Sequence, residues 1–234
     1  MRFQGRVVMV TGAAGALGRM VAATFEREGA SLVLLDASAE GLRAAFGEAG
    51  GTRLPVAADL TDDAAVRRAV DAALARFGRI DVLCNIAGAF RMGPPVHETP
   101  AELWRFMMDV NAGTVLSTAR AVVPTMLAAG SGRIVNVSAA ASREGKAGMA
   151  AYCASKDAVT RLTESMAAEL RDRGINVNCV LPSIIDTPQN RKDMPDADFA
   201  RWVAPAALAE VIAFLASDAA RAVHGAAIPV VGLS

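Results

Sequence analysis

Short apolar runs alternate with helical patterns along the 234-residue chain, and this alternation restricts the possible folds more than any other feature. The apolar runs are nearly continuous, as is typical of parallel strands that are covered by helices on both faces. Successive parallel strands are connected by right-handed crossovers. The sequence therefore predicts an α/β fold with a doubly wound parallel sheet of about seven strands and helices on both faces.

The expected elements can be placed by residue range. Strands are expected at residues 6–11, 31–35, 53–57, 81–85, 133–138, 175–181 and 226–231, and helices include residues 16–28, 62–77, 101–129, 150–172 and 206–217. No repeat or linker divides the chain, so residues 1–234 are predicted to form a single domain. The irregular segment 182–205 contains four prolines. A long insert of this kind indicates a substrate lid or, alternatively, a plain surface loop.

Charge and composition exclude several classes of function. Lys plus Arg and Asp plus Glu both number 24, so no basic surface indicates nucleic-acid binding. The three cysteines, His97 and His224 show no metal-ligand spacing, so no metal site is expected. No apolar run approaches the roughly 18 residues of a membrane span, and no secretory signal is evident. A cytoplasmic protein that binds a small molecule is the expectation.

A glycine-rich turn, TGAAGALG at residues 11–18, lies between the first expected strand and the first expected helix. Gly12 permits a tight turn, Gly15 allows the backbone to approach a phosphate, and Gly18 allows close packing of the helix. The free N–H groups at the start of such a helix bind a pyrophosphate. The turn therefore predicts a dinucleotide site.

Asp36 ends the second expected strand, eighteen residues after Gly18. A carboxylate at this place accepts hydrogen bonds from the adenosine ribose hydroxyls and repels a 2′-phosphate. Positions 13, 14 and 37 are alanines, so they supply no cation for that phosphate. Asp36 therefore favours NAD(H) over NADP(H), although it could instead be only a helix cap.

Tyr152 and Lys156 are four residues apart in an expected helix, so they lie on the same face. Hydride transfer to a C=O or C=N bond builds negative charge on the heteroatom, where a proton must be donated. Tyrosine has a pKa of about 10, and a nearby ammonium group is expected to lower it. The pair is thus a candidate acid–base site, or alternatively an ordinary helical surface pair.

Taken in this order, the features resemble the short-chain dehydrogenase/reductase family, in which a TGxxxGxG turn precedes a YxxxK pair by about 140 residues. Asn85-Ile86-Ala87-Gly88 resembles the NNAG motif of the family, and residues 182–187 resemble its PGxIxT segment. The resemblance implies a Rossmann-like NAD-dependent enzyme in which Tyr152 donates the proton and Lys156 binds the ribose. It also implies that Asn111 anchors a proton-relaying water and that the protein is a homotetramer.

The resemblance further implies a set of site residues. The cofactor-binding residues would be Gly12, Gly15, Leu17, Gly18, Asp36, Asp59, Leu60, Asn85, Ala87, Gly88, Tyr152, Lys156, Pro182, Ile185 and Thr187, and the catalytic residues would be Tyr152, Lys156 and Asn111. The substrate-slot candidates are Phe90, Ala139, Met149 and Trp202. Phe90, Met149 and Trp202 could equally be ordinary packing residues.

The family has a serine thirteen residues before its tyrosine, but residue 139 of this chain is alanine. Ser138 lies one position earlier, and a one-residue offset on a strand turns a side chain to the opposite face. Ser142 lies three positions later. Either serine could replace the missing donor only if the end of the strand bends.

Quinoid dihydropteridine reductase, a branch of the same superfamily, also has alanine at this place. Segment 186–199 resembles part of its C-terminal region, and Gly148-Met149-x-x-Tyr152 matches one of its patterns. A quinonoid or imine-like acceptor spreads the incoming charge over a ring, so one proton donor and a flat slot suffice.

These features together predict an NAD(H)-dependent reductase of a small C=N, quinonoid or carbonyl acceptor. Two alternatives stay open at this point. The chain could be an alcohol or ketone dehydrogenase that uses Ser138, or a non-catalytic dinucleotide-binding sensor or partner subunit.

Overall fold

The computed structural model describes all 234 residues and confirms the expected parallel sheet of seven strands. In space the strands follow the order β3-β2-β1-β4-β5-β6-β7, so the direction of winding reverses beside β1. Such a reversal opens a crevice at the carboxyl ends of the strands. The strands are β1 (Val7–Thr11), β2 (Ser31–Asp36), β3 (Arg53–Ala57), β4 (Val82–Asn85), β5 (Gly132–Val137), β6 (Ile175–Pro182) and β7 (Ala227–Val230).

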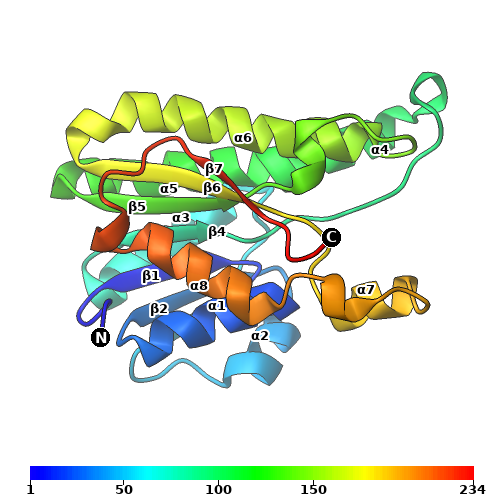
Figure 1. Cartoon of the computed structure of the whole chain (residues 1–234). Coiled ribbons are helices and arrows are strands. Elements are labelled where there is room, and N and C mark those ends of the chain that lie inside the picture. The colour runs from blue at the N-terminus through cyan, green and yellow to red at the C-terminus, as the bar shows by residue number, and fades with distance from the viewer.

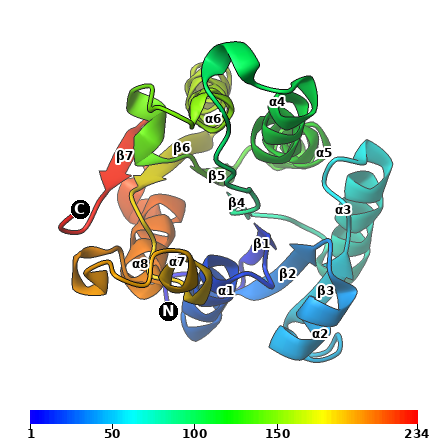
Figure 2. The ribbon, with the colours of Figure 1, turned by 90° about the vertical axis from the view of Figure 1, so that its right-hand side faces the viewer.

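Helices cover both faces of the sheet, as Figures 1 and 2 show. One face is covered by α1 (Ala16–Arg27) and α8 (Pro205–Ala216), with α2 (Ala39–Phe46) beside β2 and β3. The other face is covered by α3 (Asp63–Phe77), α5 (Thr114–Ala129) and α6 (Ala150–Leu170). Two shorter helices, α4 (Ala101–Met108) and α7 (Pro188–Asp193), lie at the end of the molecule where the strands finish.

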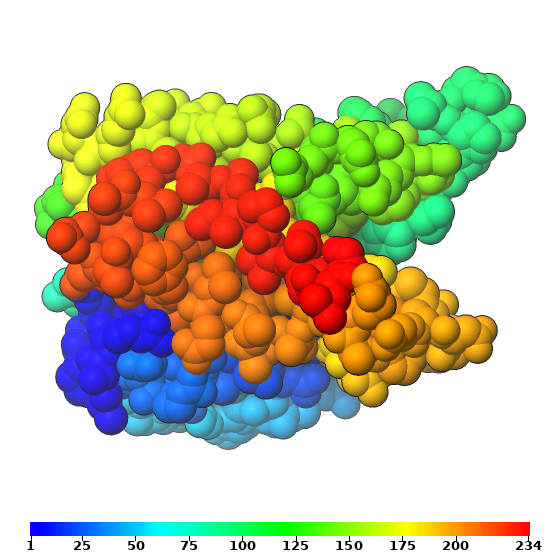
Figure 3. All heavy atoms as spheres, viewed as in Figure 1, coloured from blue at the N-terminus to red at the C-terminus, as the bar shows by residue number.

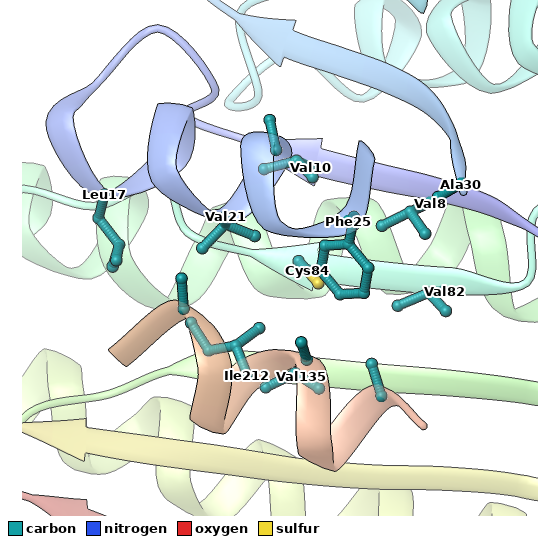
Figure 4. Close-up of a cluster of buried hydrophobic side chains, with 14 of the residues drawn as sticks. Val8, Val10, Leu17, Val21, Phe25, Ala30, Val82, Cys84, Val135 and Ile212 are labelled. Carbon is teal, nitrogen blue, oxygen red and sulfur yellow. The ribbon is translucent and has the colours of Figure 1, made fainter. Parts of the chain in front are cut away.

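Alternating residues along the strands belong to two separate hydrophobic cores, one on each face of the sheet. On β1, Val8 and Val10 belong to the core beneath α1 and α8, whereas Val7 and Met9 belong to the core on the opposite face. Phe25 of α1 is fully buried in the first core, and truncating such a side chain to alanine costs about 3–5 kcal/mol. Figure 4 shows how side chains of α1, α8 and the central strands meet in this core: Val8, Val10, Val21, Phe25, Val82, Val135 and Ile212.

The helix expected at residues 101–129 is interrupted. A π-helical turn, Asp109–Gly113, separates α4 from α5 and carries Asn111 toward the interior. The whole run 101–129 is long and apolar enough, by length and composition, to cross a membrane, contrary to the expectation that no run approaches such a span. Because 44% of its most apolar window is buried and α5 packs on α3 and β5, this run has the character of a core helix.

Segment 182–205 is more ordered than expected. It contains α7 and a 3₁₀ turn, Phe199–Arg201. Pro188 occupies the first turn of α7, and the Thr187 hydroxyl caps this helix by accepting a hydrogen bond from the Asn190 amide at 3.2 Å. An N-cap side chain and a first-turn proline are both typical of the start of a helix. The Asp186 carboxylate pairs with the Arg191 guanidinium across the first turn of this helix.

Candidate active site

A large open cavity of about 1230 Å³ lies at the carboxyl ends of the strands. Figure 3 shows this end of the molecule on the right, where an amber projection that includes α7 stands apart from the green segments above it. The cavity brings together most of the predicted site residues. Those that line it are Gly12, Gly15, Leu17, Gly18, Asp36, Asp59, Leu60, Ala87, Gly88, Phe90, Ala139, Met149, Tyr152, Lys156, Pro182, Ile185 and Thr187.

The glycine turn forms a cradle that side chains would fill. Gly12 has a φ of +60°, and a Cβ atom there would lie 2.9 Å from the Cα atom of Ala87. A Cβ atom on Gly18 would lie 2.1 Å from the main-chain oxygen of Gly12. No side chain caps α1 at Gly15, so the first N–H groups of the helix are available to an anion. This geometry fits the pyrophosphate of a dinucleotide.

Asp36 is held in place by main-chain donors on the wall of the cavity. Its Oδ2 accepts a hydrogen bond from the Ala14 amide and its Oδ1 accepts one from the Ser38 amide, both at 3.0 Å. Each oxygen retains a lone pair for a ligand. Helix α2 is capped by the Ser38 hydroxyl, which accepts from the Gly41 amide at 2.9 Å. The alternative in which Asp36 is only the helix cap is therefore wrong.

Asp59 and Leu60 lie on the same wall, after β3. Oδ1 of Asp59 accepts hydrogen bonds from the Thr61 hydroxyl at 2.7 Å and from the Thr61 amide at 2.9 Å. These bonds hold the pKa of the Asp59 carboxyl below its usual value. The carboxylate is thus fixed and charged beside the cavity.

Tyr152 and Lys156 lie one turn apart on α6 and both line the cavity. The Lys156 ammonium is buried and donates to the main-chain oxygen of Val137 at 3.0 Å. Burial lowers its pKa to about 8. The Tyr152 ring meets the Phe90 ring edge to face, with the centroids 4.9 Å apart at an interplanar angle of 89°.

Burial raises the pKa of Tyr152 to about 12, with a smaller contribution from Cys153. The expectation that the pKa of Tyr152 is lowered is therefore wrong. The reason is that desolvation disfavours the phenolate, while the Lys156 ammonium is directed to the Val137 oxygen. Tyr152 is therefore a protonated phenol across the neutral range.

Ser138 and Ala139 point in opposite directions. The Ser138 hydroxyl donates to the main-chain oxygen of Lys156 at 2.7 Å and lies 3.0 Å from the Thr160 hydroxyl. Ala139 continues the extended backbone, with φ −156° and ψ 152°, so the strand end does not bend. The Ser142 hydroxyl lies 3.3 Å from that of Ser138. Ser138 also lines the cavity, but its hydroxyl is directed to α6, and position 139 itself carries a methyl group.

Asn85 was expected to bind the cofactor, but its side chain does not line the cavity. Its Nδ2 donates to Oδ1 of Asn136 at 2.8 Å, and its Oδ1 accepts from the Thr118 hydroxyl at 2.9 Å. The side chain is buried in a polar network beneath α5 and α6. Because the pleat of β4 turns it away from the cavity, Asn85 has a structural role and the prediction for its side chain is wrong.

Asn111 also lies outside the cavity wall. Its Oδ1 accepts from the Ala89 amide at 2.9 Å, and its Nδ2 donates to the Ala89 oxygen at 3.1 Å and to the Ser155 hydroxyl at 2.9 Å. The Ser155 hydroxyl in turn donates to the main-chain oxygen of Tyr152 at 2.8 Å. Asn111 thus joins the loop after β4 to the turn of α6 that carries Tyr152.

Trp202 was expected in the substrate slot, but it is buried and does not line the cavity. Its ring packs on Phe199 with centroids 4.8 Å apart. The next residue, Val203, forms a β-bridge with Ile185, which turns this part of the segment inward. The prediction for Trp202 is therefore wrong, whereas Phe90 and Met149 do line the cavity.

Several lining residues were not anticipated from the sequence. Residues that follow β6 and β7 could have been found, because the carboxyl ends of parallel strands meet at one edge. Arg19 could have been found from its place one turn after Gly15, near the start of α1. The residues that were missed include Arg19, Lys146, Gln189, Asn190, Met194, Val231 and Ser234.

Comparison with known proteins agrees with this geometry. A model of the short chain dehydrogenase family matches residues 6–198. The D-threitol dehydrogenase of Mycolicibacterium smegmatis is 36% identical over 237 residues, covering 96% of this chain and 91% of that protein. The cis-4-hydroxycyclohexanecarboxylate dehydrogenase of Sinomonas cyclohexanicum is 38% identical over 240 residues, covering 98% and 96%. The crystal structure of carveol dehydrogenase from Mycobacterium avium in complex with NAD has a TM-score of 0.89 and 27% identity, covering 99% and 98%.

Proposed function

Because the chain belongs to the short-chain dehydrogenase family, we propose that it is an NAD(H)-dependent oxidoreductase with Tyr152 as its proton donor. We propose further that its acceptor is a conjugated C=N, quinonoid or carbonyl compound. One observation carries the proposal: Tyr152, Lys156, the glycine turn and Asp36 line a single cavity, whose wall has a methyl group at position 139 in place of a hydroxyl.

The preference for NAD(H) is supported by Asp36. Its fixed carboxylate has free lone pairs for the adenosine ribose hydroxyls, and its negative charge opposes a 2′-phosphate. Positions 14 and 37 beside it are alanines. A bound NADH supplies the hydride, and the residues of the chain supply orientation and the proton.

The acid–base roles follow from the two perturbed groups. Tyr152 keeps its proton at neutral pH, because burial raises its pKa to about 12, so it can donate to a developing anion. Lys156 is charged below its lowered pKa of about 8 and can donate to ribose hydroxyls from its buried position. Asn111, through Ser155, holds the turn of α6 that presents Tyr152.

The acceptor class is argued from what the cavity wall lacks. Ala139 offers no second donor to a carbonyl oxygen, whereas Phe90 and Met149 provide apolar surface near Tyr152. A conjugated acceptor disperses the incoming charge and depends less on such a donor. The resemblance of segment 186–199 to dihydropteridine reductase supports the same acceptor class.

A second candidate is an alcohol or ketone dehydrogenase that relies on Tyr152 alone. The observation in its favour is that the two relatives described above are named as dehydrogenases of hydroxylated compounds. Ser138 lines the cavity, but its hydroxyl is bonded to α6, which argues against the version of this candidate that uses Ser138 as the donor. A sensor without turnover would have no chemical need for the buried Tyr152 and Lys156 pair.

The assembly and surroundings of the protein are further parts of the proposal. We expect a cytoplasmic homotetramer in which segment 182–205 acts as a substrate lid, because α7 and Met194 border the cavity. Light scattering at micromolar concentration tests the assembly. A particle of four times the 24.2 kDa chain mass is expected, and a monomer would contradict it.

The function is tested by following NADH consumption against quinonoid dihydropterins, quinones, imines and simple ketones. We expect turnover that is highest with one of the conjugated acceptors. Turnover of a simple ketone above all conjugated compounds would favour the second candidate. Tight NADH binding without turnover of any acceptor would instead indicate a sensor.

A further inference from the structure

Arg19 is a cation at the glycine turn that no other side chain neutralises. Arg19 is exposed and is the fourth residue of α1. It lines the cavity close to Gly15. Its side chain takes part in none of the ion pairs or side-chain hydrogen bonds of the protein. The other cations that line the cavity, Lys146 and Lys156, belong to the loop before α6 and to α6 itself.

The position of Arg19 is unfavourable in the absence of an anion. The start of a helix carries a partial positive charge of about half a unit, so a cation in the first turns is destabilised. Acidic residues are missing from the first turn of α1, so the chain itself offers no compensation. At the other end of this helix, Arg27 has a favourable place in the last turn and pairs with Glu210.

The helix period directs Arg19 toward the place where a pyrophosphate would bind. Gly15 directly precedes α1, and its main-chain oxygen accepts a hydrogen bond from the Arg19 amide at 3.0 Å, so the two residues lie one turn apart, and both line the cavity. The free N–H groups at the start of α1 lie on the same side. A guanidinium group presents planar donors that match phosphate oxygens.

We infer that Arg19 binds the pyrophosphate of the dinucleotide from the second turn of α1 and is a further determinant of cofactor affinity. This inference rests on the proposed function. It makes a distinct prediction, because the pyrophosphate is common to NAD(H) and NADP(H). Arg19 therefore sets the affinity for both cofactors, whereas Asp36 sets the ratio between them.

The test is calorimetric titration of wild type, Arg19→Gln and Arg19→Lys with NADH, NADPH and ADP-ribose, with adenosine measured by competition. Arg27→Gln is the matched control, because it removes the same charge from the same helix away from the cavity. We expect Arg19→Gln to weaken the binding of NADH and of ADP-ribose about fivefold, which is the usual contribution of a charge-assisted hydrogen bond at an exposed site. The binding of adenosine should stay unchanged. Arg19→Lys should recover part of the loss, and Arg27→Gln should match wild type.

Unchanged binding of ADP-ribose to Arg19→Gln would overturn the inference. A loss confined to NADPH would also overturn it, because it would assign Arg19 to the 2′-phosphate. A melting temperature of Arg19→Gln at or above that of wild type excludes a folding defect as the cause of weaker binding, since this change removes a cation from the start of a helix. A failure of the proposed function can be told apart from a failure of this inference. If NADH binds with the expected dependence on Arg19 but no acceptor is reduced, the pyrophosphate contact is supported and the enzymatic role is contradicted.

Discussion

The Ser138 hydroxyl donates a hydrogen bond of 2.7 Å to the main-chain oxygen of Lys156, which ties the end of β5 to the turn of α6 that carries Tyr152 and Lys156. Both residues line the cavity, and the alternation of side chains along an extended backbone directs the Ala139 methyl group away from the side on which the Ser138 hydroxyl meets α6. A serine therefore stands beside the expected catalytic position and is used to hold the helix. The wall of the cavity keeps only a methyl group there.

The first prediction concerns Ser138. Ser138→Ala should cost about 1 kcal/mol of unfolding free energy or somewhat more, because the buried bond to the Lys156 oxygen and the contacts with the Thr160 and Ser142 hydroxyls are lost, while the Thr160 hydroxyl still donates to the Lys156 oxygen at 3.3 Å. Turnover should fall only slightly. Chemical denaturation and steady-state kinetics measure the two effects. A loss of activity as large as that of Tyr152→Phe would show that Ser138 is the missing donor.

Tyr152→Phe should lower kcat by roughly a hundredfold or more, because the proton donor is removed. The affinity for NADH should stay within about twofold of wild type, since Lys156 and the glycine turn are untouched and the edge contact with Phe90 is kept. Stopped-flow kinetics and NADH titration separate these two quantities. Retention of wild-type turnover would remove Tyr152 from the mechanism.

Asp36→Ala should reduce the preference for NADH over NADPH by about tenfold, because ribose hydrogen bonds and phosphate repulsion are lost together. The hydrogen bonds that Asp36 accepts from Ala14 and Ser38 are lost as well, so melting temperature is measured beside the two dissociation constants. Equal or tighter binding of NADPH by the wild type would refute the cofactor assignment.

The pH dependence of reduction should follow Lys156. Its pKa is lowered to about 8 by burial, so the charged form is lost as the pH rises through that value. Tyr152 stays protonated over this range, because its pKa is raised to about 12. The kcat/KM for reduction should therefore be level from about pH 6 to 7.5 and fall above about pH 8. A profile that rises between pH 8 and 9.5 would contradict these roles.

The sequence predicts the sheet well, because buried parallel strands are continuous apolar runs whose ends are marked by polar residues. All seven strands lie within about one residue of the expected ranges. The glycine turn, Asp36 and the pair Tyr152 and Lys156 come together because the carboxyl ends of the strands share one edge. The spacing of these residues along the chain is therefore sufficient to predict that they share one site.

Other features depend on contacts that spacing does not contain. A one-residue insertion in a helix leaves no clear periodic signal, so the π-helical turn around Asn111 was not expected. The directions of Asn85 and Trp202 depend on which layer each strand or loop packs against. The raised pKa of Tyr152 depends on burial by distant segments such as the loop that carries Phe90.

The central claim is that Ala139 adapts the site to conjugated acceptors, and Ala139→Ser tests it most directly. The measurement is the ratio of kcat/KM for a simple ketone to kcat/KM for a quinonoid dihydropterin, in wild type and in Ala139→Ser. The account predicts that the ratio rises by about tenfold or more in the variant, because only the ketone gains from a second oxygen-directed donor. An unchanged or lower ratio would contradict the account.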